Sequence, residues 1–174
     1  MLTPNVTLAS LEMPDFPVLR QLAATIWRQH YQGIVSAAQV EYMLTGRLSD
    51  EALLEQAHAA DRWLEILRVS DVPVGYCACE LADADSDGER AAMKLGQLYV
   101  LESYRGRGFG RYMLHHVADR ARTLGRGVLF LQVNKRNTDA IRFYEATGFR
   151  IAREAVFDIG SGFVMDDYVM EKRL

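Results

Sequence analysis

Residues 105–110 are Arg105-Gly106-Arg107-Gly108-Phe109-Gly110, and they lie between two patterned segments. An apolar run, 95–101, precedes them, and residues 109–124 carry apolar side chains at helical spacing. A strand, a glycine-rich turn and a helix start favour phosphate binding, because the first N–H groups of a helix lack intrahelical acceptors and the helix dipole adds positive charge. Glycines let ligand oxygens approach the backbone, and Arg105, Arg107 and Arg111 supply full charges suited to phosphate. We therefore predict a phosphate-binding loop.

Two common phosphate loops are excluded by the residues themselves. A Walker A loop closes with Gly-Lys-Ser/Thr, which is absent from this stretch. The dinucleotide fingerprint needs glycines spaced G-x-G-x-x-G and an acidic residue about twenty positions later, and neither is present. The loop therefore belongs to another class of phosphate site.

The rest of the chain alternates between strand and helix patterns. We predict strands at 6–11, 63–69, 74–81, 95–101, 128–133, 149–159 and 163–172, and a turn at 71–75. Helical spacing follows Asp15, Ser36 and Ser49, and extends over 109–124 and over 138–147, where Asn137 is a suitable N-cap. This order predicts an α/β fold with a mixed sheet of about seven strands, helices on both faces, and a right-handed parallel crossover over 95–133.

Composition limits the function. A chain of 174 residues suits a single domain, 1–174, and its net charge of −3 argues against a general nucleic-acid surface. Because a signal-peptide pattern and a membrane-length apolar run are both lacking, we expect a cytoplasmic protein without a membrane partner. Cys77 and Cys79 are expected to be core residues rather than metal ligands. The acidic segment 83–89 is interpreted as a solvated loop rather than a calcium site, so we expect no metal.

A second motif follows the predicted strand at 128–133. It comprises Asn134, Asn137, Ala140, Phe143-Tyr144 and Gly148-Phe149. Together with Arg105, Gly108 and Gly110, it resembles the two signatures of the GNAT superfamily of N-acetyltransferases. The resemblance spans residues 95–149 and implies a mostly antiparallel sheet whose two central parallel strands splay apart to admit acetyl-CoA.

The resemblance also implies which residues bind acetyl-CoA as a co-substrate. Backbone groups of Leu98, Tyr99 and Val100 would pair with the pantetheine arm, and the Leu98 N–H would act as the oxyanion donor. The pyrophosphate would contact the backbone of Arg105, Gly106, Arg107, Gly108, Phe109, Gly110 and Arg111. Asn134, Asn137, Ala140 and Phe143 would line the pantetheine arm, beside Tyr144.

The same resemblance assigns the chemistry, with one departure. Tyr144 would protonate the thiolate of CoA as it leaves. Many relatives carry a Glu or His two residues before the position of Leu98, but here that residue is Gly96, which cannot act as a base. Glu80 and His30 are candidates instead, and a water relay or binding of the free amine is equally open. We name Glu80 as the candidate base.

The acceptor would be a primary amine, held by the first helices and the last hairpin. Trp27, His30 and Tyr31 are the leading candidates, and the further ones are Tyr42, Phe163, Asp166, Asp167 and Tyr168. The chain is loosely similar to bacterial polyamine N-acetyltransferases, so a polyamine is the first guess, and a protein amine stays open. The alternative is a non-catalytic acyl-CoA-binding module, which Gly96 favours and Tyr144 opposes; a plain nucleotide-phosphate binder is a third hypothesis. Relatives often dimerise, and the terminal hairpin offers an edge for a homodimer.

Overall fold

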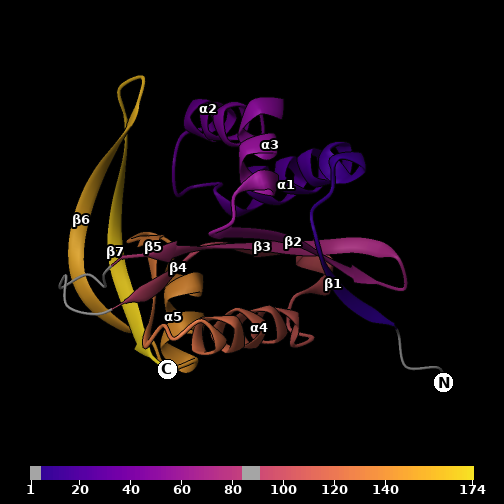
Figure 1. Cartoon of the computed structure of the whole chain (residues 1–174). Coiled ribbons are helices and arrows are strands. Elements are labelled where there is room, and N and C mark those ends of the chain that lie inside the picture. The colour runs from indigo at the N-terminus through magenta and orange to yellow at the C-terminus, as the bar shows by residue number, and fades with distance from the viewer. Residues whose placement is uncertain (1–4, 84–90) are drawn as a thin grey trace. The chain divides into compact units, whose positions relative to one another are not determined.

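The computed structural model describes residues 5–83 and 91–174 (Figure 1). In chain order the strands and helices are β1 (Val6–Ser10), α1 (Phe16–His30), α2 (Ala37–Arg47), α3 (Asp50–His58), β2 (Arg62–Val69), β3 (Val72–Ala82), β4 (Ala92–Val100), α4 (Phe109–Thr123), β5 (Val128–Asn134), α5 (Thr138–Ala146), β6 (Arg150–Gly160) and β7 (Phe163–Arg173). Short 3-10 helices lie at Met13–Asp15 and Glu102–Tyr104. The predicted order of elements is therefore confirmed.

The strands form one seven-stranded sheet in the order β1-β2-β3-β4-β5-β7-β6. β4 pairs with β5 in parallel, from Ala92↔Val128 to Leu95↔Leu131. The pairs β1–β2, β5–β7 and β6–β7 are antiparallel. The α/β class, the mostly antiparallel sheet and the central parallel pair are thus confirmed. Beyond the paired positions β4 continues to Val100, while β5 stays paired with β7 up to Asn134.

The chain forms two compact units, and each is described by itself. The N-terminal unit contains the chain up to Cys79 together with Gln97–Leu114. In this unit α1–α3 lie on one face of β1–β3, and the first turns of α4 lie on the other (Figure 1). Its core includes Leu19, Ile26, Trp27, Leu53, Ile66 and Tyr76, each almost completely buried. Leu19, Ile26 and Trp27 form the apolar stripe of α1, and the burial of this stripe in the core fixes the orientation of the helix.

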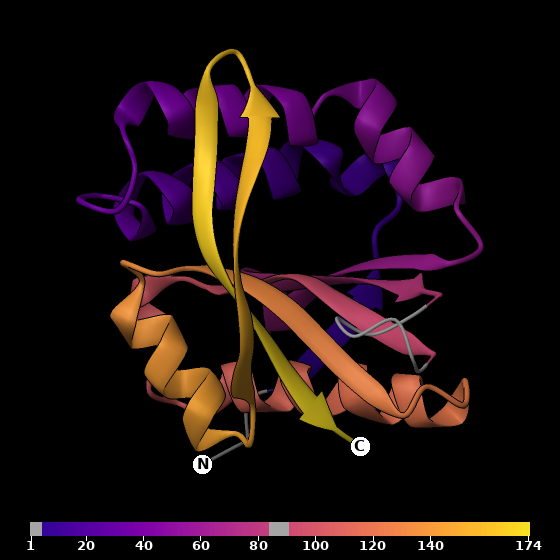
Figure 2. The same ribbon diagram turned by 90° about the vertical axis from the view of Figure 1, so that its left-hand side faces the viewer.

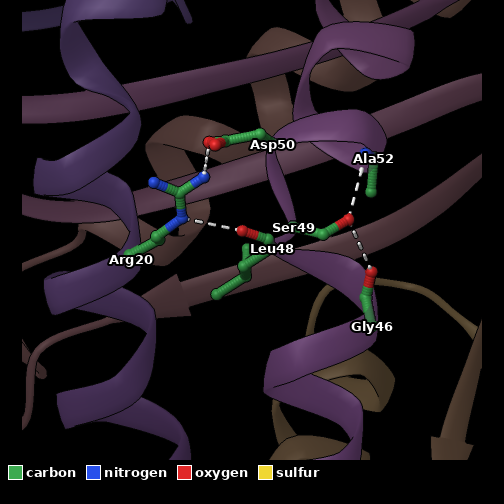
Figure 3. Close-up of polar contacts among 6 residues, drawn as sticks. All are labelled: Arg20, Gly46, Leu48, Ser49, Asp50 and Ala52. Carbon is green, nitrogen blue, oxygen red and sulfur yellow. Dashed lines mark hydrogen bonds and ion pairs between the residues drawn. The ribbon is translucent and has the colours of Figure 1, made fainter.

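Serine caps and one arginine fix the junction between α2 and α3 (Figure 3). The Ser49 Oγ accepts a hydrogen bond from the Ala52 N–H at 3.1 Å, as an N-cap residue should. From α1, the Arg20 Nε donates to the Leu48 carbonyl at 2.8 Å, and the same guanidinium pairs with the Asp50 carboxylate. Ser36 caps α2 in the same way through the Gln39 N–H. The helix starts predicted at Ser36 and Ser49 are confirmed, whereas Asp15 occupies the N-cap position of α1 without a side-chain capping bond.

The connection from β2 to β3 is shorter than predicted. Ser70 and Asp71 both have positive φ and form a two-residue turn, so β3 begins at Val72 and the predicted turn at 71–75 is wrong. Gly75 lies inside β3, where a Cβ would come 2.6 Å from the Tyr99 carbonyl oxygen. This glycine serves the close approach of two strands rather than a turn.

The C-terminal unit contains Glu80–Gly96 and His115–Leu174. Figure 2 shows β6 and β7 as a long two-stranded ribbon, with β7 beside β5. The ribbon turns at residues 160–162, all of which have positive φ. α5 begins at the cap of Asn137, whose Oδ1 accepts from the Ala140 N–H, and ends before Gly148 with φ of +94°. Both ends of α5 were predicted.

Two smaller predictions concern the cysteines and the acidic segment. Cys77 and Cys79 are buried, and neither forms a disulfide, which agrees with a place in the core. Of the acidic segment, only Asp83 belongs to the described chain, and the part from 84 to 90 lies outside it. No helix among the described residues combines the length and hydropathy needed to cross a bilayer.

Candidate functional site

The predicted phosphate loop has the backbone geometry that anion binding requires. Gly106 and Gly108 have φ of +73° and +87°, a region that L side chains rarely adopt. The helical hydrogen bonds of α4 begin with the Tyr112 N–H on the Gly108 carbonyl at 3.0 Å. The N–H groups of Phe109, Gly110 and Arg111 precede that bond and so have no helical acceptor. Residues 105–108 are exposed, which leaves this backbone accessible to a ligand.

Two of the three loop arginines donate hydrogen bonds to the chain itself, whereas all three were expected to supply charge to phosphate. The Arg105 Nε donates to the Val100 carbonyl at 3.3 Å, and Arg107 donates to the Ser103 carbonyl at 2.9 Å. The Arg107 guanidinium also lies over the Tyr104 ring, 5.0 Å from its centre. Two of the three guanidinium groups therefore brace the loop that carries them. Arg111, on the first turn of α4, is exposed.

The predicted acceptor residues gather around a side chain of β4. The Tyr31 and Tyr99 hydroxyl groups are 2.8 Å apart and share a hydrogen bond. The Trp27 and His30 rings each lie 5.7 Å from the Tyr99 ring, measured between centres, and Tyr76 lies 5.4 Å from it. We call Trp27, His30, Tyr31, Tyr76 and Tyr99 the aromatic cluster. It joins the end of α1 to the strand predicted to hold the co-substrate.

Burial governs the chemistry of two phenols in the aromatic cluster. It raises the pKa of Tyr76 and of Tyr99 well above the usual value, and for Tyr99 the neighbouring phenols of Tyr31 and Tyr76 act in the same direction. Both hydroxyl groups therefore remain protonated near neutral pH. They can donate and accept hydrogen bonds there, but they cannot serve as a base.

Tyr144, the predicted acid, lies on α5 in the C-terminal unit. Its ring makes edge-on contacts with Phe143 and Phe149, with centres 5.2 and 5.4 Å away. Its carbonyl accepts from the Thr147 Oγ1 and from the N–H groups of Thr147 and Phe149. Side chain and backbone are thus both held, so the orientation of the phenol is fixed by the end of α5.

Asn134 and Asn137 build the connection between β5 and α5. The Asn134 Oδ1 accepts from the Arg136 N–H at 3.0 Å, and the Asn137 N–H donates to the Asn134 carbonyl at 2.9 Å. Because the Asn137 Oδ1 caps α5, both side-chain oxygens serve the local fold. Ala140 is the residue whose N–H receives that cap. The second motif therefore has a structural explanation as well as the predicted binding one.

Glu80, the candidate base, forms a cross-strand ion pair. Its Oε1 is 3.4 Å from the Lys94 Nζ, and both side chains are about one-third exposed. Gly96 lies on the same strand as Lys94, and it is exposed. Glu80 therefore has a structural partner that the sequence did not reveal.

The predicted site residues fall into two groups. Trp27, His30, Tyr31, Leu98, Tyr99, Val100 and the loop 105–111 belong to the N-terminal unit. Glu80, Asn134, Asn137, Ala140, Phe143 and Tyr144 belong to the C-terminal unit. Sequence reasoning missed the side chains of Tyr76 and Tyr99, and it missed Arg47, whose guanidinium lies 6.0 Å from the centre of the Trp27 ring. The alternation of β3 and β4 could have flagged the two tyrosines, whereas no local pattern signals Arg47.

A family model for the GNAT acetyltransferases matches residues 19–149. The chain belongs to the GNAT acetyltransferase family. The match includes both signatures, α2, α3 and most of α1, so the resemblance seen in the sequence is confirmed.

Individual GNAT relatives agree with this assignment. An uncharacterized N-acetyltransferase of Mycobacterium bovis is 36% identical over 87 residues, which cover 50% of this chain and 55% of that protein. The chain thus spans about half the length of the curated relatives it matches. Among solved structures, the PaiA N-acetyltransferase of Thermoplasma acidophilum in complex with coenzyme A has a TM-score of 0.80 at 20% identity, covering 98% of this chain and 99% of that one. Arabidopsis thaliana Naa50 with a bisubstrate analogue has a TM-score of 0.68 at 23% identity, covering 97% and 99%.

Proposed function

We propose that the protein transfers an acetyl group from acetyl-CoA to a primary amine. The observation that carries the proposal is the loop 105–111, where Gly106 and Gly108 have positive φ, residues 105–108 are exposed, and the first N–H groups of α4 have no helical acceptor. Membership of the GNAT family supplies the context, and relatives with bound coenzyme A support acetyl-CoA as the co-substrate.

The residues of the loop fit a diphosphate. The N–H groups of Phe109, Gly110 and Arg111 point from a helix start, where an anion is stabilised by the helix dipole. A Cβ at Gly106 or Gly108 would meet no neighbouring atom within 4 Å, so space for an approaching ligand is present on both glycines. Arg111 adds a positive charge on the same turn, while Arg105 and Arg107 hold the loop in shape. Leu98, Tyr99 and Val100 would pair with the pantetheine arm through their backbone.

The reaction forms one bond and breaks one bond at the thioester carbonyl. The amine nitrogen bonds to the carbonyl carbon, and the carbon–sulfur bond breaks as the thiolate departs. In our proposal the Leu98 N–H stabilises the negative charge that develops on the carbonyl oxygen. Tyr144 gives its proton to the departing sulfur, and Glu80, directly or through water, takes the proton that the ammonium group must lose before attack. The second proton, which the nitrogen loses as the amide forms, restores the Tyr144 phenol.

The acceptor is proposed to contact the exposed side of the aromatic cluster. His30, Tyr31 and Tyr99 are partly exposed, whereas Trp27 and Tyr76 are buried beneath them. Of the similar structures, the PaiA N-acetyltransferase holds coenzyme A, and Naa50 holds the bisubstrate analogue CoA-Ac-MVNAL. A small amine such as a polyamine and a protein amine are therefore both retained as classes of acceptor.

A thiol-release assay with a panel of amines tests the proposal. The panel should contain polyamines, amino acids and short peptides, and acetyl-CoA binding should be measured in parallel. We expect CoA release that depends on at least one amine and that yields the acetylated product. Tight acetyl-CoA binding without release for any amine would instead support a non-catalytic acyl-CoA-binding module, which Gly96 favours as the missing base on β4.

A further inference from the structure

Arg47, at the C-terminal end of α2, lies beside the aromatic cluster. Its guanidinium is 6.0 Å from the centre of the Trp27 ring, and Trp27 in turn contacts Tyr31 and Tyr99. Its charge lowers the pKa of Tyr76 and Tyr99, although burial dominates and raises both. The charge of Arg47 therefore acts on Tyr99, a phenol that the acceptor is proposed to contact.

The neighbouring arginines of the N-terminal unit are neutralised by carboxylates. The pairs are Arg20–Asp50, Arg28–Glu41, Arg62–Glu55 and Arg68–Asp15. Within residues 5–83 and 91–174, Arg47 has no carboxylate partner, and its side chain is exposed. An uncompensated cation beside aromatic rings attracts an anion and repels a second cation.

We infer that Arg47 selects amines that carry a negatively charged group, a carboxylate or a phosphate, at the end away from the reacting nitrogen. This inference rests on the proposed acetyl transfer and narrows its acceptor class. A polyamine would place its second ammonium group near the Arg47 guanidinium, whereas a carboxylate or phosphate there could accept two hydrogen bonds from it. The cation–π contact with the Trp27 ring, at 6.0 Å from its centre, holds the guanidinium beside the aromatic cluster.

Four acceptors with the same alkyl chain test the inference. They are an ω-amino carboxylate, its neutral amide, the corresponding diamine and the aminoalkyl phosphate, compared by kcat/KM with acetyl-CoA saturating. We expect the carboxylate or the phosphate to exceed the amide by about tenfold, as one charge-assisted contact provides, and the diamine to be the poorest. The ranking of carboxylate against phosphate identifies which anion the site takes.

Arg47 variants assign the preference to this side chain. Arg47→Met keeps an extended chain against Trp27 and should bring the ratio of anionic to neutral acceptor close to one. Arg47→Lys should retain part of the preference, and Arg47→Glu should reverse it in favour of the diamine. Arg28→Met is the matched control on α1, because Arg28 is already paired with Glu41, and it should keep the wild-type ratio.

The results of these assays distinguish failure of the Arg47 inference from failure of the proposed acetyl transfer. A wild-type preference for the diamine, or an anion preference unchanged in Arg47→Met, would overturn the inference and leave acetyl transfer standing. Absence of acetylation of every amine, in a protein that binds acetyl-CoA, would overturn the proposed function and the inference together. A general loss of activity in Arg47→Met with the ratio preserved counts against selection by charge.

Discussion

At the scale of single residues, Tyr144 and Gly75 show how position gives an ordinary side chain its role. Tyr144 is a phenol held edge-on between two phenylalanines at the end of a helix. Gly75 has no side chain, which allows β3 and β4 to approach closely at this position. One prediction removes the hydroxyl group of Tyr144, and another adds a methyl group at Gly75.

Tyr144→Phe removes the proposed proton donor and leaves the ring that packs on Phe143 and Phe149. We expect kcat to fall by roughly 10²–10³, because an unprotonated thiolate is a poorer leaving group, while acetyl-CoA binding stays nearly intact. Steady-state kinetics with a separate binding titration measures both effects. Turnover close to that of the wild type would remove Tyr144 from the mechanism.

Gly75→Ala places a methyl group 2.6 Å from the Tyr99 carbonyl oxygen. The strands must separate to accept it, and we expect a loss of about 1–3 kcal/mol in the free energy of unfolding. Chemical denaturation measures the loss. Gly46→Ala on α2 is the control, since a Cβ there meets nothing within 4 Å, and it should be neutral or stabilising by up to about 1 kcal/mol. Equal effects of the two variants would contradict the close-approach explanation.

At the scale of elements, the ends of the helices carry both stability and function. Ser36, Ser49 and Asn137 each accept a backbone N–H at the start of a helix, and the helical hydrogen bonds of α4 begin only at the Tyr112 N–H. The N-termini of α2, α3 and α5 are therefore capped by side chains. α4 starts with backbone N–H groups that the proposed diphosphate would satisfy.

Asn137 combines a cap on α5 with a proposed contact to the pantetheine arm. Asn137→Ala should cost about 1 kcal/mol of stability, because the Ala140 N–H loses its acceptor. Asn137→Asp keeps an oxygen acceptor and should keep that stability. If the amide also contacts acetyl-CoA, both variants will bind the co-substrate more weakly. Wild-type affinity in Asn137→Asp would restrict Asn137 to the cap.

At the scale of the whole molecule, local patterns predict the order of elements but not the pairing of distant side chains. The loop 105–110 was predictable because glycine spacing, arginines and a helix start are contiguous in sequence. The Tyr31–Tyr99 hydrogen bond joins residues 68 positions apart, and the Glu80–Lys94 pair depends on the register of two strands. The turn at Ser70–Asp71 was missed because neither residue is a glycine, although both adopt positive φ. A site formed by the backbone of one contiguous segment was therefore easier to predict than contacts between side chains that are distant in sequence.

The phenols of Tyr76 and Tyr99 should make the free energy of unfolding depend on pH. Tyr76 and Tyr99 have pKa values raised well above 10 in the folded protein, so folding favours their protonated forms. Their contribution is complete below about pH 10, the unfolded pKa of tyrosine, and is lost as the pH rises beyond it. Urea denaturation between about pH 9 and about pH 11 should show falling stability, with a shallower fall in the double variant Tyr76→Phe/Tyr99→Phe. An identical slope in that variant would contradict the assignment.

The most direct test of the central claim, that the loop 105–111 grips the diphosphate of acetyl-CoA, is unfolding of the intact chain with and without ligand. At a free concentration of 100 Kd, acetyl-CoA should raise the free energy of unfolding by about 2.7 kcal/mol, while ATP at the same concentration should raise it little. Equal stabilisation by ATP, or no stabilisation by acetyl-CoA, would contradict the account.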